Sequence, residues 1–327
     1  MNLTSGLEAW DSTGSLWPFD NAFPVTPIML VSILLATLGR TRELRQFFDS
    51  LSAQTWTGFE VVVIDQNSDD RLVHLLAKYS GRFPLRHLRS PRGHSRAFNV
   101  GLAYATGDIV AFPDDDCWYD PDLLARVVRF FESNPNCSGL TGREVVVEGF
   151  TSGGRWSRRA GPITRENVWR RAITFSMFLR QSLVRDMRFD ESLGVGAGTA
   201  WGAGEETDYL LRAVEQGHSI HYDPSLVIWH QGRSGPYDAN ILSKARAYGM
   251  GVGRVLRKHH YPIHSVAYHL LRPLGGTLLS LGAGRIDKAR YHWSIFAGRT
   301  GGWIAPREAS VSKAASRLIS GSEANLP

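Results

Sequence analysis

Continuous apolar runs recur through the first part of the chain. The runs IMLVSILLA (28–36), FEVVVID (59–65) and DIVAFP (108–113) lack alternation, which is typical of strands that are covered on both faces. The shorter run LRHLR (85–89) predicts a further strand, and SIHYDPSLVIWH (219–230) predicts a strand that ends at His230.

Segments with helical periodicity separate these runs. Leu44, Phe47, Phe48 and Leu51 recur at intervals of three and four, so we expect an amphipathic helix that Thr41 is placed to cap. A second helix is expected over residues 95–105. The apolar positions of a third are Leu123, Leu124, Val127, Val128 and Phe131.

The alternation of strands and helices predicts a doubly wound α/β sheet. In such sheets ligands bind beyond the carboxyl ends of the strands. Asp65 and the cluster Asp114–Asp116 both follow strand ends, so we expect them to line one crevice.

The cluster Asp114–Asp116 admits two interpretations. Carboxylates suit Mg²⁺ or Mn²⁺, which commonly bridge protein carboxylates to a substrate phosphate. The alternative is a solvated acidic loop in front of a helix that starts near Pro121 and Asp122. The buried strand before the cluster favours the metal site. For Cys117 a packed thiol is favoured over a metal ligand, because hard cations prefer oxygen.

A second acidic segment, WGAGEETDYLLRAVEQGH, starts a predicted helix after a glycine-rich loop. Its acids could simply stabilise the helix N-terminus, and the spacing of Asp208 and Arg212 predicts a surface ion pair. A carboxylate beside a glycine-rich loop also fits a general base, for which Glu205 and Glu206 are the candidates.

The last third of the chain is basic. Residues 240–260 have helical periodicity but contain Gly249, Gly251 and Gly253, which weaken an isolated helix. A later apolar run, VAYHLLRPLGGTLLSLGAG, is too interrupted to predict a spanning helix. Together they predict either an element lying on an anionic membrane surface or an ordinary helical subdomain.

Composition sets further bounds. With 43% hydrophobic and 21% charged residues the chain is of globular type, and its net charge of +6 favours phosphate-bearing partners. Two cysteines exclude a disulfide framework, and the first twenty residues lack the features of a signal peptide. We therefore expect a cytoplasmic protein, with peripheral attachment to the inner face of the cell membrane as a further option. The expected divisions are an irregular arm (1–27), the α/β domain (28–235), a basic helical region (236–308) and a flexible tail (309–327).

The order of several motifs resembles the family 2 glycosyltransferases of the GT-A fold, of the kind that build bacterial polysaccharides. These motifs are VSILLATLGR, VVVIDQNSDD, GHSRAFNVGLAYATGD, AFPDDDCWYDPDLL, GEETDYLLRAVEQGH and IWH. The match covers roughly residues 28–232. It implies a Rossmann-like, doubly wound mixed sheet followed by a C-terminal helical extension.

The resemblance also implies roles for single residues. Donor contacts fall on Thr37 and Arg40 at the nucleotide, on Asp65 and Gln66 at the nucleobase, and on Asp114 and Asp115 at the diphosphate. Asp116, Asp114 and His230 match the positions that hold Mn²⁺ or Mg²⁺. Glu206 matches the catalytic base. The family usually has an Arg just before Asn99, where this chain has Phe98.

The implied activity is a metal-dependent, inverting transfer of a sugar from a nucleotide-sugar donor to a glycan or lipid-linked glycan acceptor. Two alternatives stay open. A sugar nucleotidyltransferase would also use carboxylate-bound Mg²⁺, but the first strand lacks the glycine-rich basic loop that such enzymes carry. A nucleic-acid-binding protein would use the basic third, yet that region matches no RNA-binding motif and we expect no nucleic-acid partner.

Overall fold

A computed structural model describes residues 29–147, 156–232 and 235–306. The expected arm (1–27) and tail (309–327) lie outside the described residues. The chain forms two compact units. Within the described residues the first, here the sheet unit, takes in 29–91, 96–147, 156–188 and 212–232, and the second, here the helical unit, takes in 92–95, 189–211 and 235–306. The expected domain boundaries remain predictions.

The sheet unit is built on a mixed sheet that has nine strands within the described residues. The strands are β1 (Val31–Thr37), β2 (Phe59–Asp65), β3 (Leu85–Arg89), β4 (Ile109–Ala111), β5 (Cys117–Tyr119), β6 (Gly139–Val146), β7 (Gly161–Pro162), β8 (Met177–Arg180) and β9 (Ile220–His230). Their order is β3-β2-β1-β4-β8-β6-β9-β5, and β7 pairs with β9. The first four strands are parallel, whereas β8 runs antiparallel to both β4 and β6.

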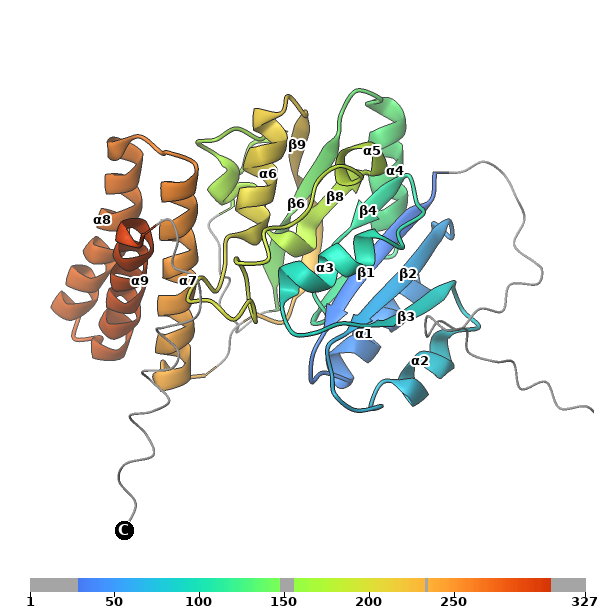
Figure 1. Cartoon of the computed structure of the whole chain (residues 1–327), viewed down its shortest axis with the longest axis horizontal. Coiled ribbons are helices and arrows are strands. Elements are labelled where there is room, and N and C mark those ends of the chain that lie inside the picture. The colour runs from blue at the N-terminus through green and yellow to red at the C-terminus, as the bar shows by residue number, and fades with distance from the viewer. Residues whose placement is uncertain (1–28, 148–155, 233–234, 307–327) are drawn as a thin grey trace, which may run out of the picture. The chain divides into compact units, whose positions relative to one another are not determined.

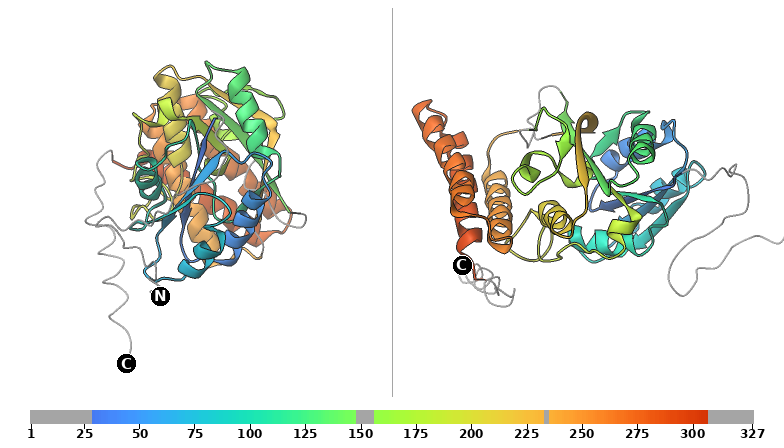
Figure 2. Two further views of the ribbon diagram at one scale, coloured as in Figure 1. Left: turned by 90° about the vertical axis from the view of Figure 1, so that its right-hand side faces the viewer. Right: turned by 90° about the horizontal axis from the view of Figure 1, so that it is seen from above.

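Helices cover both faces of the sheet (Figure 2). The helices that involve the sheet unit are α1 (Arg42–Ser52), α2 (Val73–Tyr79), α3 (His94–Leu102), α4 (Leu123–Ser133), α5 (Gln181–Val184) and α6 (Glu205–Glu215), with short 3₁₀ turns η1 (Val168–Arg170) and η2 (Thr174–Ser176). α1, α2 and α4 bury their apolar faces in one core with alternate residues of β1, β2 and β4. On the other face, Gly101 of α3 lies so close to Leu34 and Ile64 that a side chain there would collide with Ile64. The doubly wound fold class is therefore confirmed.

Local details differ from the sequence expectations in two places. Thr41 occupies the N-cap position of α1, but its side chain makes no capping hydrogen bond, so the expected side-chain cap is wrong. α3 begins one residue earlier than expected and ends at Leu102, because the chain turns after it: the N–H groups of Ala103 and Tyr104 donate to the carbonyls of Val100 and Gly101.

The helical unit contains α7 (Ala239–Lys258), α8 (Ile263–Gly282) and α9 (Ile286–Ile304) (Figure 1). Two of the glycines that weaken α7 as an isolated helix, Gly249 and Gly253, allow it to approach α9 closely. A Cβ at Gly253 would collide with the carbonyl oxygen of Arg299, and one at Gly302 would collide with that of Met250. Among the described residues, no helix has the length and apolar character needed to cross a membrane.

Candidate active site

The acidic cluster lies where three chain segments meet in the sheet unit. β4 ends at Ala111, and a bridge between Ala36 and Asp114 brings the cluster to the carboxyl end of β1. β5 then pairs with β9 so that Cys117 lies opposite His230. Strand pairing therefore places His230 beside the cluster.

Thr37 and Arg40 hold Asp115 in place. The Thr37 hydroxyl donates to Asp115 Oδ2 at 2.6 Å, and the Arg40 guanidinium donates to Asp115 Oδ1. Asp115 is 6% exposed, and burial raises the pKa of its carboxyl, an effect that Arg40 and Thr37 offset only in part. The structure thus brings three predicted donor-site residues together, and the two carboxylate oxygens of Asp115 are bound by Thr37 and Arg40.

Asp114, Asp116 and His230 form the second part of the cluster. One ligand atom from each of the three side chains lies within 4.8 Å of the others. His230 Nε2 is 3.1 Å from Asp116 Oδ1, and Arg40 Nη1 is 2.8 Å from Asp116 Oδ2. Burial alone would raise the pKa of Asp116, but the hydrogen bond and charge of His230, with the charge of Arg40, lower it. Asp116 is therefore an anion that is ready to bind a cation.

The donor set fits a divalent cation. Two carboxylates and one imidazole offer two hard oxygens and a nitrogen, and a nitrogen ligand suits Mn²⁺ better than Mg²⁺, whose protein ligands are oxygens. Burial alone would lower the pKa of His230, but Asp116, Asp114 and Glu144 raise it. A proton and a cation would therefore compete for this imidazole.

Neighbouring groups orient the His230 ring. The ring stacks on Phe175 with centroids 5.1 Å apart and planes 2° from parallel. Its Nδ1 accepts a hydrogen bond from the N–H of Gly232 at 2.9 Å, and Glu144 Oε1 lies 3.4 Å from the same nitrogen. Because Nδ1 accepts, the neutral ring carries its proton on Nε2, facing Asp116.

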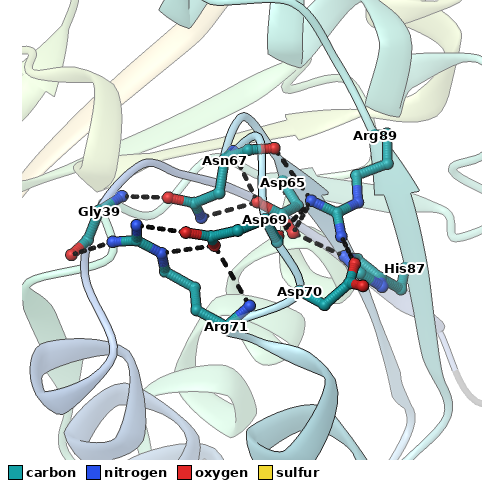
Figure 3. A network of polar contacts seen from close by, with 8 residues as sticks. All are labelled: Gly39, Asp65, Asn67, Asp69, Asp70, Arg71, His87 and Arg89. Carbon is teal, nitrogen blue, oxygen red and sulfur yellow. Dashed lines mark hydrogen bonds and ion pairs between the residues drawn. The ribbon is translucent and has the colours of Figure 1, made fainter.

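Asp65 lies at the neighbouring strand end within a polar network (Figure 3). It is fully buried; its Oδ1 accepts from the backbone and side chain of Asn67 at 2.8 and 2.7 Å, and its Oδ2 lies 3.0 Å from His87 Nε2 and 3.1 Å from Arg89 Nη1. Burial alone would raise the pKa of Asp65, but these hydrogen bonds and the charge of Arg89 lower it. Gly39 N–H donates to Asn67 Oδ1 at 2.7 Å, so the network ties the loop after β1 to the loop after β2.

The glutamates of the second acidic segment lie in the helical unit at the start of α6. Glu205 is 6% exposed, and its Oε1 lies 3.1 Å from His94 Nδ1. The residues around His94 are fixed to the loop before α6, since His94 N–H donates to Val195 O at 2.9 Å. Gly194, at φ +101°, makes room for the carboxylate, because a Cβ there would lie 3.0 Å from Glu205 Cδ.

Glu206 differs from its neighbour. It is partly buried and accepts a hydrogen bond from the Thr207 hydroxyl at 3.0 Å. Burial and the adjacent charge of Glu205 raise the pKa of Glu206 to about 7. A carboxylate that titrates near neutral pH is suited to accept a proton from a hydroxyl, which favours Glu206 over Glu205 as a base.

Asp208 does not lie on the surface, as the expected surface pair with Arg212 requires, so that expected position is wrong. Asp208 is fully buried, and its Oδ1 lies 2.7 Å from Lys258 Nζ and 2.8 Å from His259 Nε2. Lys258 also binds Asp190 at 2.7 Å. The end of α7 is thereby fastened to the start of α6 within the helical unit.

Sequence reasoning missed several residues that support the site: His87, Arg89, Glu144 and His94. The first two could have been found, since Arg89 pairs in register with Asp65 at the ends of parallel strands. The other two are placed by contacts between segments distant in sequence.

Phe98, which stands where the family usually has an Arg, is a core residue packed edge-to-face on Phe112. Cys117 is fully buried, and burial raises the pKa of its thiol, which agrees with a packed thiol.

Known proteins resemble this chain at the level of sequence. The family model described as glycosyl transferase family 2 matches residues 32–187. An uncharacterized glycosyltransferase of Haemophilus influenzae is 32% identical over 127 residues, which are 37% of this chain and 42% of that protein. Glycosyltransferase AglE of Haloferax volcanii is 24% identical over 233 residues, 68% of this chain and 72% of AglE. For three of the relatives, the Haemophilus influenzae protein among them, the matched part is less than half of the relative's own length.

Solved structures share the fold. Staphylococcus aureus TarS 1–349 in complex with UDP-GlcNAc superposes with a TM-score of 0.56 at 18% identity, covering 83% of this chain and 93% of TarS. The mannosyltransferase PcManGT from Pyrobaculum calidifontis, in complex with GDP-Man and Mn²⁺, gives 0.58 at 18% identity, covering 88% and 90%. The chain therefore carries a glycosyl transferase family 2 domain with the GT-A fold.

Proposed function

We propose that this protein transfers a sugar from a nucleotide-sugar donor to a hydroxyl of a glycan acceptor, with inversion at the anomeric carbon. The observation that carries the proposal is the convergence of Asp114, Asp116 and His230 from the ends of two strands. The family match spans the segment that contains the acidic cluster, which favours sugar transfer over nucleotidyl transfer or nucleic-acid binding.

The donor side is assigned to the sheet unit. Asp116, Asp114 and His230 would hold Mn²⁺ or Mg²⁺, and the cation, when bound, supplies positive charge to the diphosphate leaving group. Arg40 binds both Asp115 and Asp116, so it would hold Asp116 beside the cation and the donor diphosphate.

The nucleoside is assigned to the loops after β1 and β2, with Thr37 and Arg40 on one side and Asp65 and Gln66 on the other. Asp65 already accepts hydrogen bonds at both oxygens, so it fixes the position of the loop in addition to any contact with the base. The complexes of TarS with UDP-GlcNAc and of PcManGT with GDP-Man support a nucleotide-sugar donor, with uracil or guanine as the base.

The acceptor side is assigned to Glu206. Its carboxylate takes the proton of the acceptor hydroxyl while the hydroxyl oxygen forms a bond to the anomeric carbon. The bond from that carbon to the diphosphate oxygen breaks on the opposite face, and the diphosphate leaves with the bonding electron pair. The raised pKa of Glu206, about 7, suits this transfer at neutral pH.

For the biological setting we propose a lipid-linked glycan acceptor in the synthesis of surface polysaccharide for the cell envelope. Such an acceptor would be anchored in a membrane, so the enzyme would work beside a membrane surface. The basic C-terminal third supports this setting through its charge.

A panel of nucleotide sugars, including UDP-GlcNAc and GDP-mannose, tests the proposal. We expect at least one donor to raise the melting temperature with Mn²⁺ present and not after chelation, and to release nucleoside diphosphate slowly in the absence of an acceptor. Failure of every donor in both assays would contradict the proposed function.

A further inference from the structure

α8 turns its larger apolar side chains outward. Its exposed face carries Tyr268, Leu271, Leu278 and Leu279, which are 57%, 60%, 62% and 79% exposed. Gly275 lies on the same face, and an added Cβ there would meet no atom within 4 Å. The stripe therefore continues along three turns of the helix.

The opposite face of α8 is the buried one, and its side chains are smaller or more polar. It consists of Val266, Pro273, Thr277 and Ser280. A helix on the surface of a water-soluble domain normally buries its leucines and exposes its polar groups. α8 has the reverse arrangement. Its exposed face is thus suited to an apolar surrounding, because contiguous apolar side chains in water mark a contact surface.

The charges near this stripe are almost all positive. Between Ile263 and Pro306 the chain has five Lys or Arg residues (Arg272, Arg285, Lys288, Arg290 and Arg299) and one carboxylate, Asp287. Asp287 lies 3.7 Å from Arg290. Among the described residues, no carboxylate forms an ion pair with Arg272 or Arg299.

Arg299 shows that, within the described part of the chain, this positive charge is not neutralised. Its Nη1 donates to the carbonyl of His269 at 2.6 Å, and its buried Nε has no partner among the described residues. Burial and the charge of Arg272 lower the pKa of Arg299 to about 10, so it remains a cation at neutral pH. Burial and the same two arginines lower the pKa of His269 to about 4.

Charge decides between the occupants that an apolar face could take. A second copy of the chain would bring an equally positive surface against this one, which is unfavourable. An anionic lipid surface offers apolar chains to the leucines and phosphates to the arginines. Since no described helix is suited to cross a membrane, the contact would lie along the surface.

We infer that α8 docks on an anionic lipid bilayer, with Tyr268, Leu271, Leu278 and Leu279 at the boundary of headgroups and acyl chains and Arg272 at the lipid phosphates. The inference deepens the proposed function, since it assigns the contact with the membrane of a lipid-linked acceptor to one face of one helix.

Co-sedimentation of the full chain with vesicles tests the inference without any donor. Vesicles of equal parts phosphatidylglycerol and phosphatidylcholine should bind the chain, and phosphatidylcholine alone should bind it several-fold more weakly. Raising the salt concentration from about 0.1 M to about 0.5 M should weaken binding to the anionic vesicles. Leu279→Glu should reduce that binding at least tenfold. Val73→Glu, an exposed apolar position of α2, is the matched control and should bind as the unmodified chain does.

Arg272→Gln should reduce binding to anionic vesicles and leave the weak binding to phosphatidylcholine unchanged. No binding to anionic vesicles at low salt, or equal loss in Leu279→Glu and Val73→Glu, would overturn the inference. Light scattering could instead show a dimer that Leu279→Glu dissociates. If the chain then binds no vesicles, the exposed face of α8 would be assigned to a second copy of the chain. If the chain binds vesicles but binds no nucleotide sugar, the inference about α8 stands and the proposed function is contradicted.

Discussion

His230 Nε2 lies 3.1 Å from Asp116 Oδ1, although Asp116 lies in the turn before β5 and His230 is the last residue of β9. The pairing of β5 with β9 fixes this distance, because Cys117, the residue after Asp116, lies directly opposite His230. Strand register thus brings the two residues together, and the side chains around them then set the orientation of the ring and the carboxylate.

Glu144 should support the metal site through His230. When Nε2 binds a cation, the proton of the neutral ring has to be on Nδ1, which then gives up the hydrogen bond that it accepts from Gly232 N–H, and Glu144 Oε1 at 3.4 Å is placed to accept the proton of Nδ1. Glu144→Gln should therefore weaken Mn²⁺ binding about 10- to 100-fold, as is usual for groups that orient a metal-binding histidine. Calorimetric titration with Mn²⁺ measures this. Unchanged affinity would show that Glu144 does not orient the ring.

Glu206→Gln should reduce the transfer rate about 10²- to 10⁴-fold, because it removes the group that accepts the acceptor proton. Donor binding should stay near normal, since the donor contacts are assigned to other residues. Glu205→Gln should retain more activity, because Glu205 is bound to His94 and is assigned no proton transfer. The reverse ranking of the two variants in steady-state kinetics would move the base to Glu205.

The pH profile should report on Glu206. A base acts only when it is deprotonated, so the rate should rise with pH through a pKa of about 7. At one pH unit below that pKa the rate should be roughly tenfold lower than its plateau at high pH. Glu205→Gln removes the adjacent negative charge that helps to raise this pKa, so its acidic limb should move to lower pH. A profile whose limb stays in place in Glu205→Gln would show that the two carboxylates do not interact.

Two adjacent glycines of α9 should respond in opposite ways to a methyl group. A Cβ at Gly302 would collide with the carbonyl oxygen of Met250 in α7, whereas one at Gly301 would meet nothing within 4 Å. Gly302→Ala should destabilise the fold by about 1–3 kcal/mol or more through overpacking. Gly301→Ala should stabilise it by about 0.5–1 kcal/mol through helix propensity. Denaturant unfolding distinguishes them, and equal effects would contradict the close packing of α7 on α9.

The sequence predicted those features that depend on local pattern. Val31–Thr37 and Phe59–Asp65 are continuous apolar runs, so their burial on both faces follows from the sequence itself. The position of the acidic cluster follows from the strand that precedes it. In the same way, the expected C-terminal helix over residues 240–260 corresponds closely to α7.

The features that were missed depend on partners distant in sequence. The spacing of Asp208 and Arg212 indicates a surface pair, but Lys258 and His259 at the end of α7 bury Asp208 and bind it. Helix propensity counts Gly249 and Gly253 of α7 only as destabilising, because the helix that packs against them, α9, lies about fifty residues further on. The contact between His94 and Glu205 likewise depends on the backbone pairing of His94 with Val195.

Calorimetric titration of a nucleotide sugar, UDP-GlcNAc or GDP-mannose, with and without Mn²⁺ tests the donor site most directly. The unmodified chain should bind one of these donors in the presence of Mn²⁺ and lose most of that affinity when Mn²⁺ is chelated. Asp116→Asn should bind the donor weakly under both conditions, while its circular dichroism spectrum and melting temperature stay close to those of the unmodified chain. Donor affinity in Asp116→Asn equal to that of the unmodified chain, at the same Mn²⁺ concentration, would contradict a metal-assisted donor site at Asp114, Asp116 and His230.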